Sequence, residues 1–227
     1  MTKPKPTPHP GYQTSKPLIV PIQEMFTELG AQDASIQLQE VATSYLEQAA
    51  AAGGAKAKFL RALYAQHGVP HGTHSFAQMR ETAYGSYLLI TYALFEKMIK
   101  GCIKEYKIKN RPSIWVTKNN KKRLPPLLEL VGNMPAAQRA ILASPPEYRL
   151  LEYYRLVRVS NTHVSQQTLR KARSAYAALT TSDLGHISQY EYIAVAPNPP
   201  GAITFEDFKL YTRSIKYYSN LLNEVCA

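Results

Sequence analysis

Apolar residues recur at intervals of three and four along most of this chain, the spacing that places them on one face of an α-helix. The longest such run begins after Ser75 and ends near Lys109. Its members form one stripe: Gly85, Leu88, Tyr92, Phe95, Ile99, Cys102 or Ile103, and Tyr106. A helix of roughly 34 residues is on the order of 50 Å long. We therefore predict that it forms the centre of a helical bundle.

Shorter periodic segments lie on both sides of this helix. Three helices begin with clear capping signals: the long helix at Ser75 with Gln78, and two shorter ones at Ser144 with Pro145 and Glu147 and at Thr204 with Asp207. The expected helices span 35–52, 56–67, 75–109, 125–131, 135–142, 144–164, 167–179 and 204–225. No strand pattern is present beyond a brief alternation at 190–195. The predicted fold is all-α: a helical bundle with a long central helix and two irregular loops, one of them at 183–201.

The first 17 residues differ from the rest of the chain, because they hold five prolines and three lysines. Such a composition favours extended, solvated chain over a packed element. The remaining length, in a chain of 227 residues that is 45% hydrophobic, is enough for one core. We predict a disordered arm over 1–17 and a single helical domain over 18–227.

Lys and Arg outnumber Asp and Glu by 27 to 16, which gives a formal charge of +11. This excess suits a polyanionic partner such as nucleic acid, or an anionic membrane surface. Residues 18–55 contain five acids and no Lys or Arg, so the basic excess lies in the arm and after Lys56. No basic amphipathic helix is present at either end, which makes the membrane the weaker candidate.

Neither a membrane span nor a secretory signal is evident. The most apolar segment, Tyr84 to Phe95, is followed at once by Glu96 and Lys97, and a span needs about 20 apolar residues. The start of the chain lacks an apolar signal-peptide core. Cys102 and Cys226 are too few for a disulfide framework and fall in helical segments. We expect a cytoplasmic protein with two reduced core thiols.

A metal site is the first chemistry to consider, because His67, His71 and His74 lie within eight residues. Zinc sites usually take at least one ligand from a distant segment and hold ligands on regular elements. Two of these histidines fall in a Gly- and Pro-rich loop. We therefore expect no metal and no other cofactor.

Basic and aromatic residues alternate between Lys104 and Arg123, where eight Lys or Arg accompany one acid and the only tryptophan. Ammonium groups that meet phosphates and rings that stack on bases are typical of single-stranded nucleic-acid binding. The candidate RNA contacts are Lys118, Lys121, Lys122, Arg123 and Trp115. The alternative is a solvated loop whose tryptophan anchors it to the core.

A second basic segment, 149–173, holds six basic residues and one acid. It supplies Arg155 as a further candidate RNA contact, and Arg158 followed five residues later by His163. A guanidinium binds phosphate bidentately and an imidazole transfers protons near neutral pH, which are the two functions that metal-independent RNA cleavage needs. Eleven Arg and six His predict roughly 0.3 chance occurrences of one fixed spacing, so the spacing alone is a weak signal.

Context distinguishes this pair from the looser match of Arg61 with His67. The pair follows a strong helix start and an aromatic-rich helix, and further basic residues flank it. Positions five apart point about 140° away from each other on a regular helix. The two side chains meet only if the helix loosens at Ser160 and Asn161, if the arginine reaches round, or if two copies of the chain pair.

The Arg158 and His163 pair, with four residues between them, resembles the motif of HEPN superfamily ribonucleases. The long helix with Tyr92, Phe95 and Glu96, the motif helix and the last helix extend the likeness over about 35–225. The resemblance implies a HEPN-like homodimer whose two motif helices form one composite RNA-cleaving site. It also implies a toxin or antiviral defence protein, with an antitoxin protein as a possible partner and tRNA or mRNA as substrate.

In that mechanism the ribose 2′-hydroxyl attacks the adjacent phosphate, His163 transfers protons and Arg158 stabilises the developing charge. The residue after the motif arginine is often polar in active relatives, whereas here it is Val159. Asn161, three positions after Arg158, is the candidate to orient it or a phosphate. Two other functions stay open: a non-catalytic RNA-binding or regulatory module, and a protein-interaction bundle that uses the acidic 18–55 segment.

Overall fold

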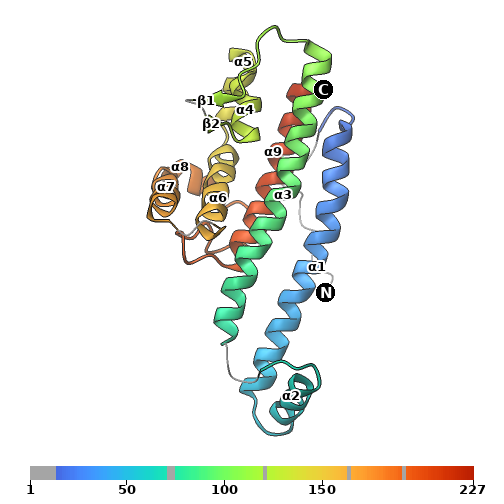
Figure 1. Ribbon diagram of the computed structural model, residues 1–227, viewed down its shortest axis with the longest axis vertical. Helices are drawn as coiled ribbons and strands as arrows, with labels where there is room; N and C mark the ends of the chain where they lie inside the picture. Colours follow the sequence, from blue (N-terminus) through green and yellow to red (C-terminus); the bar gives the residue numbers. More distant parts are fainter. Residues whose placement is uncertain (1–13, 71–74, 120–121, 163–164, 191–192) are drawn as a thin grey trace.

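The computed structural model describes residues 14–70, 75–119, 122–162, 165–190 and 193–227 (Figure 1). Within these residues the chain forms helices and one short hairpin, which confirms the all-α prediction. The helices are α1 (Val20–Ala51), α2 (Gly54–Gln66), α3 (Phe76–Asn110), α4 (Pro126–Gly132), α5 (Ala136–Ala143), α6 (Pro146–Thr162), α7 (Gln166–Ala177), α8 (Thr181–Ile187) and α9 (Phe205–Cys226). The hairpin pairs β1 (Lys118–Asn119) with β2 (Lys122–Arg123) in antiparallel register.

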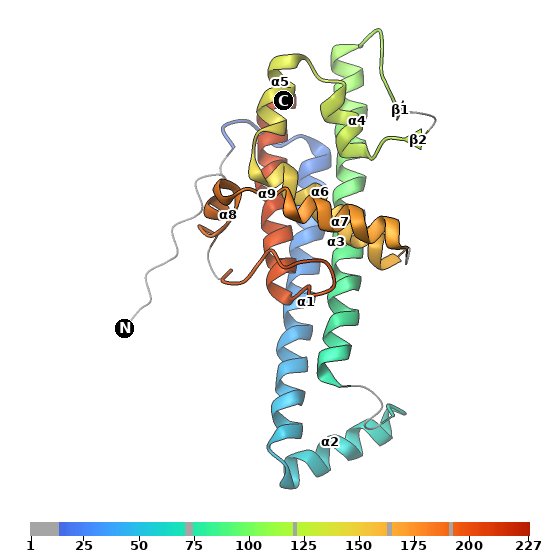
Figure 2. The same cartoon turned by 90° about the vertical axis from the view of Figure 1, so that its left-hand side faces the viewer.

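Three long helices, α1, α3 and α9, lie side by side and define the long axis of the molecule (Figures 1 and 2). The predicted stripe of α3 is buried between them, with Leu88, Ile99 and Cys102 fully inaccessible. Helix α6 packs on α3 and α9, and α7 lies across the outside of α6. The lower part of α1 and α3 extends beyond α9 and carries only α2 (Figure 1).

Two of the predicted start signals act as expected. The Ser75 hydroxyl accepts from the Gln78 amide at 3.2 Å, and the Thr204 amide donates to the Asp207 carboxylate at 2.9 Å. Helix α6 begins at Pro146, but Glu147 does not cap it. Its side chain is fully buried and accepts a hydrogen bond of 2.7 Å from the Tyr190 hydroxyl, so a tertiary contact replaces the local one.

Helix α1 differs most from its prediction, because it begins at Val20 rather than at residue 35. Its first half buries Ile22, Met25 and Leu29, and the interrupting Asp33 is neutralised by Lys216 at 2.7 Å. In its second half Ile36 is buried, while Leu38, Val41 and Tyr45 are exposed, as described below. Helix α8 was also missed, since its capping box of Thr180 and Asp183 lies at the edge of the predicted 183–201 loop.

Several predictions concern residues that lie at the limits of the described segments or outside them. Of the predicted arm, residues 1–13 lie outside the described residues, while Thr14 and Ser15 hydrogen-bond to Glu224 on α9. His71 and His74 also lie outside, and no metal-binding group of His, Cys, Asp or Glu occurs in the described part. Cys102 and Cys226 are buried free thiols. None of the described helices is long and apolar enough to cross a membrane.

Candidate functional site at the end of α6

The last two turns of α6 face the first half of α3, and this contact positions Arg158. Its guanidinium carbon lies 4.3 Å from the centre of the Tyr92 ring, a cation–π contact. The Arg158 Nε is buried and hydrogen-bonds to no atom of the described residues. Burial raises the pKa of the Tyr92 hydroxyl to about 12, so the ring stays neutral beneath the cation. The contact holds the arginine in one place without consuming its Nε donor.

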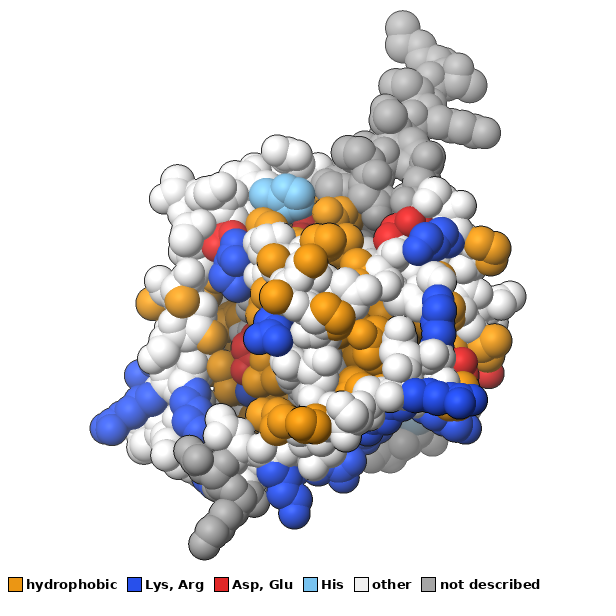
Figure 3. All heavy atoms as spheres, turned by 90° about the horizontal axis from the view of Figure 1, so that it is seen from above, with side chains coloured by type: hydrophobic (Ala, Val, Ile, Leu, Met, Phe, Trp, Pro, Cys, Tyr) orange, Lys and Arg blue, Asp and Glu red, His pale blue; other side chains and the backbone are white. Residues whose placement is uncertain are grey.

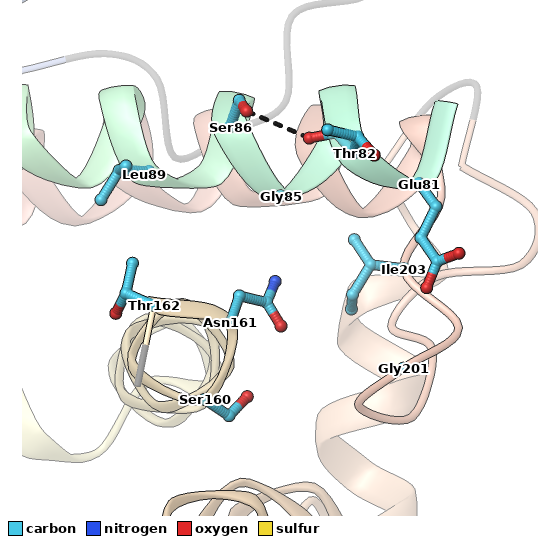
Figure 4. A pocket seen from close by; sticks show the side chains of 10 residues that line it. All are labelled: Glu81, Thr82, Gly85, Ser86, Leu89, Ser160, Asn161, Thr162, Gly201 and Ile203. Atoms are coloured by element: carbon cyan, nitrogen blue, oxygen red, sulfur yellow. Dashed lines mark hydrogen bonds between the residues drawn. The ribbon is translucent and has the colours of Figure 1, made fainter. Parts of the chain in front are cut away.

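Asn161 lies on the same face of α6, one turn further along, and opens onto a pocket. This pocket, of about 520 Å³, is bounded by α3, the end of α6 and the loop before α9. In Figure 4 Asn161 and Thr162 point from α6 towards α3, while the Glu81 carboxylate extends down from the start of α3. The two helices are close at Gly85, where a Cβ would lie in van der Waals contact with the Asn161 amide nitrogen, at 3.4 Å. Arg158 itself does not line the pocket.

The end of α6 remains helical through Ser160 and Asn161. The Ser160 hydroxyl donates to the Val157 carbonyl at 2.7 Å, and the Thr162 hydroxyl donates to the Arg158 carbonyl at 3.1 Å. The loosening that would bring Arg158 and His163 onto one stripe is therefore not found at these two positions. His163 lies outside the described residues, so its distance from Arg158 stays a prediction.

Two arginines of the basic 149–173 segment are committed to ion pairs. Arg155 binds Glu152 bidentately, at 2.7 and 2.6 Å, with 17% of its side chain exposed. Arg149 binds the buried Asp183 in the same bidentate manner. Arg155, a predicted RNA contact, therefore has both its Nε and one terminal nitrogen occupied by a neighbour on its own helix.

Exposed positive charge lies instead on α7, directly beside α6. Arg170, Lys171 and Arg173 are exposed, and no acid in the described part of the chain pairs with them. These three residues were not singled out from the sequence as RNA contacts. A usable signal was present, however, because no Asp or Glu occurs anywhere from 153 to 182. Bases in the middle of such a stretch, such as those of α7, have no acid near them in sequence.

The second group of predicted RNA contacts lies on the hairpin. Lys118, Lys122 and Arg123 are all exposed, and Lys118 pairs directly opposite Arg123 across the strands. Like charges in this arrangement repel each other unless an anion lies between them. Lys121 lies outside the described residues. In the view of Figure 3, Lys and Arg side chains gather along one rim of this end of the molecule.

Trp115 has a structural role at the base of this hairpin. Its indole Nε1 donates to the buried Glu129 at 2.7 Å, and the Lys107 ammonium lies 4.4 Å from the ring centre. The ring also packs against the core. The sequence left two roles open for this residue, and the contacts favour the anchor over a stacking platform for bases.

Comparison of the chain with models of known protein families, with characterised proteins and with solved structures gives no match. The site must therefore be judged on its own geometry. It offers a fixed arginine, a polar pocket beside it and two exposed basic surfaces, one adjacent on α7 and one on the hairpin near α4 and α5 (Figure 1).

Proposed function

We propose that this protein binds single-stranded RNA through its basic surfaces and cleaves it without a metal ion at the end of α6. The observation that carries the proposal is the Arg158 guanidinium, fixed over the Tyr92 ring beside an α7 that displays three exposed bases. A phosphate held there would gain charge-assisted hydrogen bonds. The resemblance to HEPN ribonucleases supplies the reaction.

In the proposed reaction the RNA is both substrate and nucleophile. His163 removes the proton from the ribose 2′-hydroxyl, the 2′-oxygen bonds to phosphorus, and the bond to the 5′-oxygen breaks. The leaving oxygen takes up a proton from the second histidine of a homodimer, and a cyclic phosphate end remains. Arg158 stabilises the charge that builds up on the phosphorus oxygens, and Asn161 orients the RNA from the neighbouring pocket.

The matched variants Arg158→Lys and His163→Gln test this proposal. Each should lower cleavage of labelled single-stranded RNA in EDTA by at least about 100-fold, because one removes bidentate phosphate binding and the other the proton carrier. Arg61→Ala, an exposed arginine on α2 at the end of the molecule opposite the hairpin (Figure 1), serves as the control and should cleave normally. Growth inhibition on expression, relieved by the same two variants, is the expected cellular sign of a cytoplasmic toxin or defence effector.

A second function, RNA binding without cleavage, is favoured by one specific observation. The Arg158 guanidinium is stacked on Tyr92 and Arg155 is bound to Glu152, as in a purely structural helix contact. The same assay separates the two functions. RNA that is bound in EDTA yet yields no cyclic-phosphate ends would overturn cleavage and leave a regulatory module, and an antitoxin or other protein would then be the partner to seek.

A further inference from the structure

The outward face of α1 carries an apolar stripe that the fold leaves uncovered. Leu38, Val41 and Tyr45 are 70%, 65% and 66% exposed. Together with Ala31 and Ala34 they repeat at alternating intervals of three and four residues, the spacing of a helix–helix seam. Three large side chains exposed to this degree form a patch on the order of a few hundred Å², the size at which patches mark interaction sites.

The fold explains why this stripe has no partner within the chain. Beyond Ile36, which contacts Phe208 in the core, α1 extends past α9 and packs only against α3 and α2 (Figure 1). A helix in a two-helix arrangement buries one face, and the opposite face remains open. The seam lies on that opposite face, away from α3 and therefore away from α6.

The distribution of charge identifies the occupant. The acids of this half of α1 face α3, where Arg80 binds Glu40 at 3.1 Å and Glu47 at 2.5 Å. None of the residues from 30 to 51 that are exposed overall is charged, and the partly exposed Glu47 is bound to Arg80. Because the chain carries +11 overall, two copies repel each other over most of their surfaces. The neutral face of α1 is where they meet with the least repulsion.

The orientation follows from the shape of the molecule. In an antiparallel pair with its two-fold axis near Val41, the two bundles lie at opposite ends, which separates their basic surfaces. This register brings Leu38 beside Tyr45 of the second copy. A parallel pair would place both basic bundles side by side.

We propose that the protein self-associates through an antiparallel pairing of α1, along the seam formed by Ala31, Ala34, Leu38, Val41 and Tyr45. The contact is isologous, since the same face serves both copies. It is separate from any pairing of the α6 helices, so it does not depend on the proposed RNA cleavage.

Sedimentation analysis of the full chain tests the contact. Val41→Lys should weaken the association through α1 by at least about 100-fold and leave only any pairing through α6, because it places two ammonium groups next to each other in the seam. Ile108→Lys, a 60% exposed position on α3, is the matched control and should associate like the unmodified chain. Both variants should keep the full helical circular dichroism signal. A monomeric unmodified chain, or association that Val41→Lys leaves unchanged, would overturn the proposal.

Cysteine cross-linking tests the orientation, because the two natural thiols are buried. The double variant Leu38→Cys/Tyr45→Cys should form a covalent dimer on oxidation, while neither single variant should cross-link to itself. Efficient self-linking of the single variants would overturn the antiparallel register. Adding Arg158→Ala to the double cysteine variant should leave its cross-linking unchanged. A loss of RNA cleavage in that protein would therefore not affect the test of the seam.

Discussion

Buried carboxylates hold distant parts of this chain together. Glu129, Glu147, Asp183 and Asp207 are each at most 5% exposed. Asp207 accepts from the Tyr154 hydroxyl at 2.9 Å and from the Asn198 amide at 2.9 Å, which ties α6, α9 and the loop between them to one point. Losing such an acid leaves its buried donors unpaired, which costs more than the bond itself contributed.

The stabilisation that the buried Asp183 carboxylate provides depends on pH. Its bond to the Arg149 guanidinium, together with that from the Thr180 amide, lowers its pKa from 3.8 to about 2. A lowered pKa means that this stabilisation is complete above the unfolded value and is lost as the pH falls through the folded value, between about pH 4 and pH 2.

Asp183→Asn should therefore lower the free energy of unfolding by about 1–2 kcal/mol at pH 7, a figure that allows for the partly exposed guanidinium. The difference from the parent should shrink between pH 4 and pH 2. Urea unfolding across this range measures it, with Glu105→Gln at an exposed acid of α3 as the control. Parallel pH profiles for parent and Asp183→Asn would contradict the assignment.

At the scale of the elements, the close crossing of α1 and α3 sets the frame of the bundle. Gly101 on α3 lies against Pro21 in the first turn of α1, and a Cβ on this glycine would be 2.7 Å from the proline Cβ. The proline ring is rigid and cannot turn aside. The two backbones can approach this closely only because one residue has no side chain.

Gly101→Ala should accordingly destabilise the protein by about 1–3 kcal/mol, because the added methyl forces the helices apart. Gly185→Ala on α8 is the matched control, since nothing lies within 4 Å of its added Cβ. The control substitution should leave the stability unchanged or raise it slightly, because alanine has a higher helix propensity than glycine. Equal thermal midpoints for the two variants would contradict this prediction and show that α1 can shift away from the added methyl group without loss of stability.

At the scale of the whole molecule, basic and acidic side chains differ in their exposure to solvent. Several acids are buried or paired, while the bases of α7 and the hairpin project into solvent. The hairpin and the Asn161 pocket lie towards opposite ends of α6 (Figure 1), whose 17 residues span about 25 Å. An RNA that reaches both would be a single strand that runs along this side of the bundle.

RNA affinity measured against salt concentration should report on the hairpin. The double variant Lys118→Gln/Lys122→Gln should lower the salt dependence by about 1.4 in the slope of log K against log salt, if each lysine meets one phosphate. Lys97→Gln/Lys100→Gln removes the same charge from lysines that are ion-paired on α3, to Glu28 and Glu96, and should leave the slope unchanged. Equal slopes for both variants would place the RNA elsewhere.

The helices whose signals are local could be predicted from the sequence alone. The α3 stripe and the Ser75 and Thr204 caps depend on neighbours within a few residues, and the structure agrees with all three. The basic character of the 149–173 segment was also evident from its composition. Periodicity and capping are short-range effects, so they can be read without the fold.

The availability of individual side chains, in contrast, depends on the tertiary fold. Arg155 and Trp115 were candidate RNA contacts, and in the structure Glu152 binds the Arg155 guanidinium while Glu129 accepts from the Trp115 indole. Whether they also contact RNA stays a prediction. On α1, Leu38, Val41 and Tyr45 lie on a helical face that no other described element covers, whereas Ile36 on the same helix is buried. Burial and pairing depend on residues far apart in the chain, so a sequence pattern that defines a helix does not state which of its faces will meet a partner.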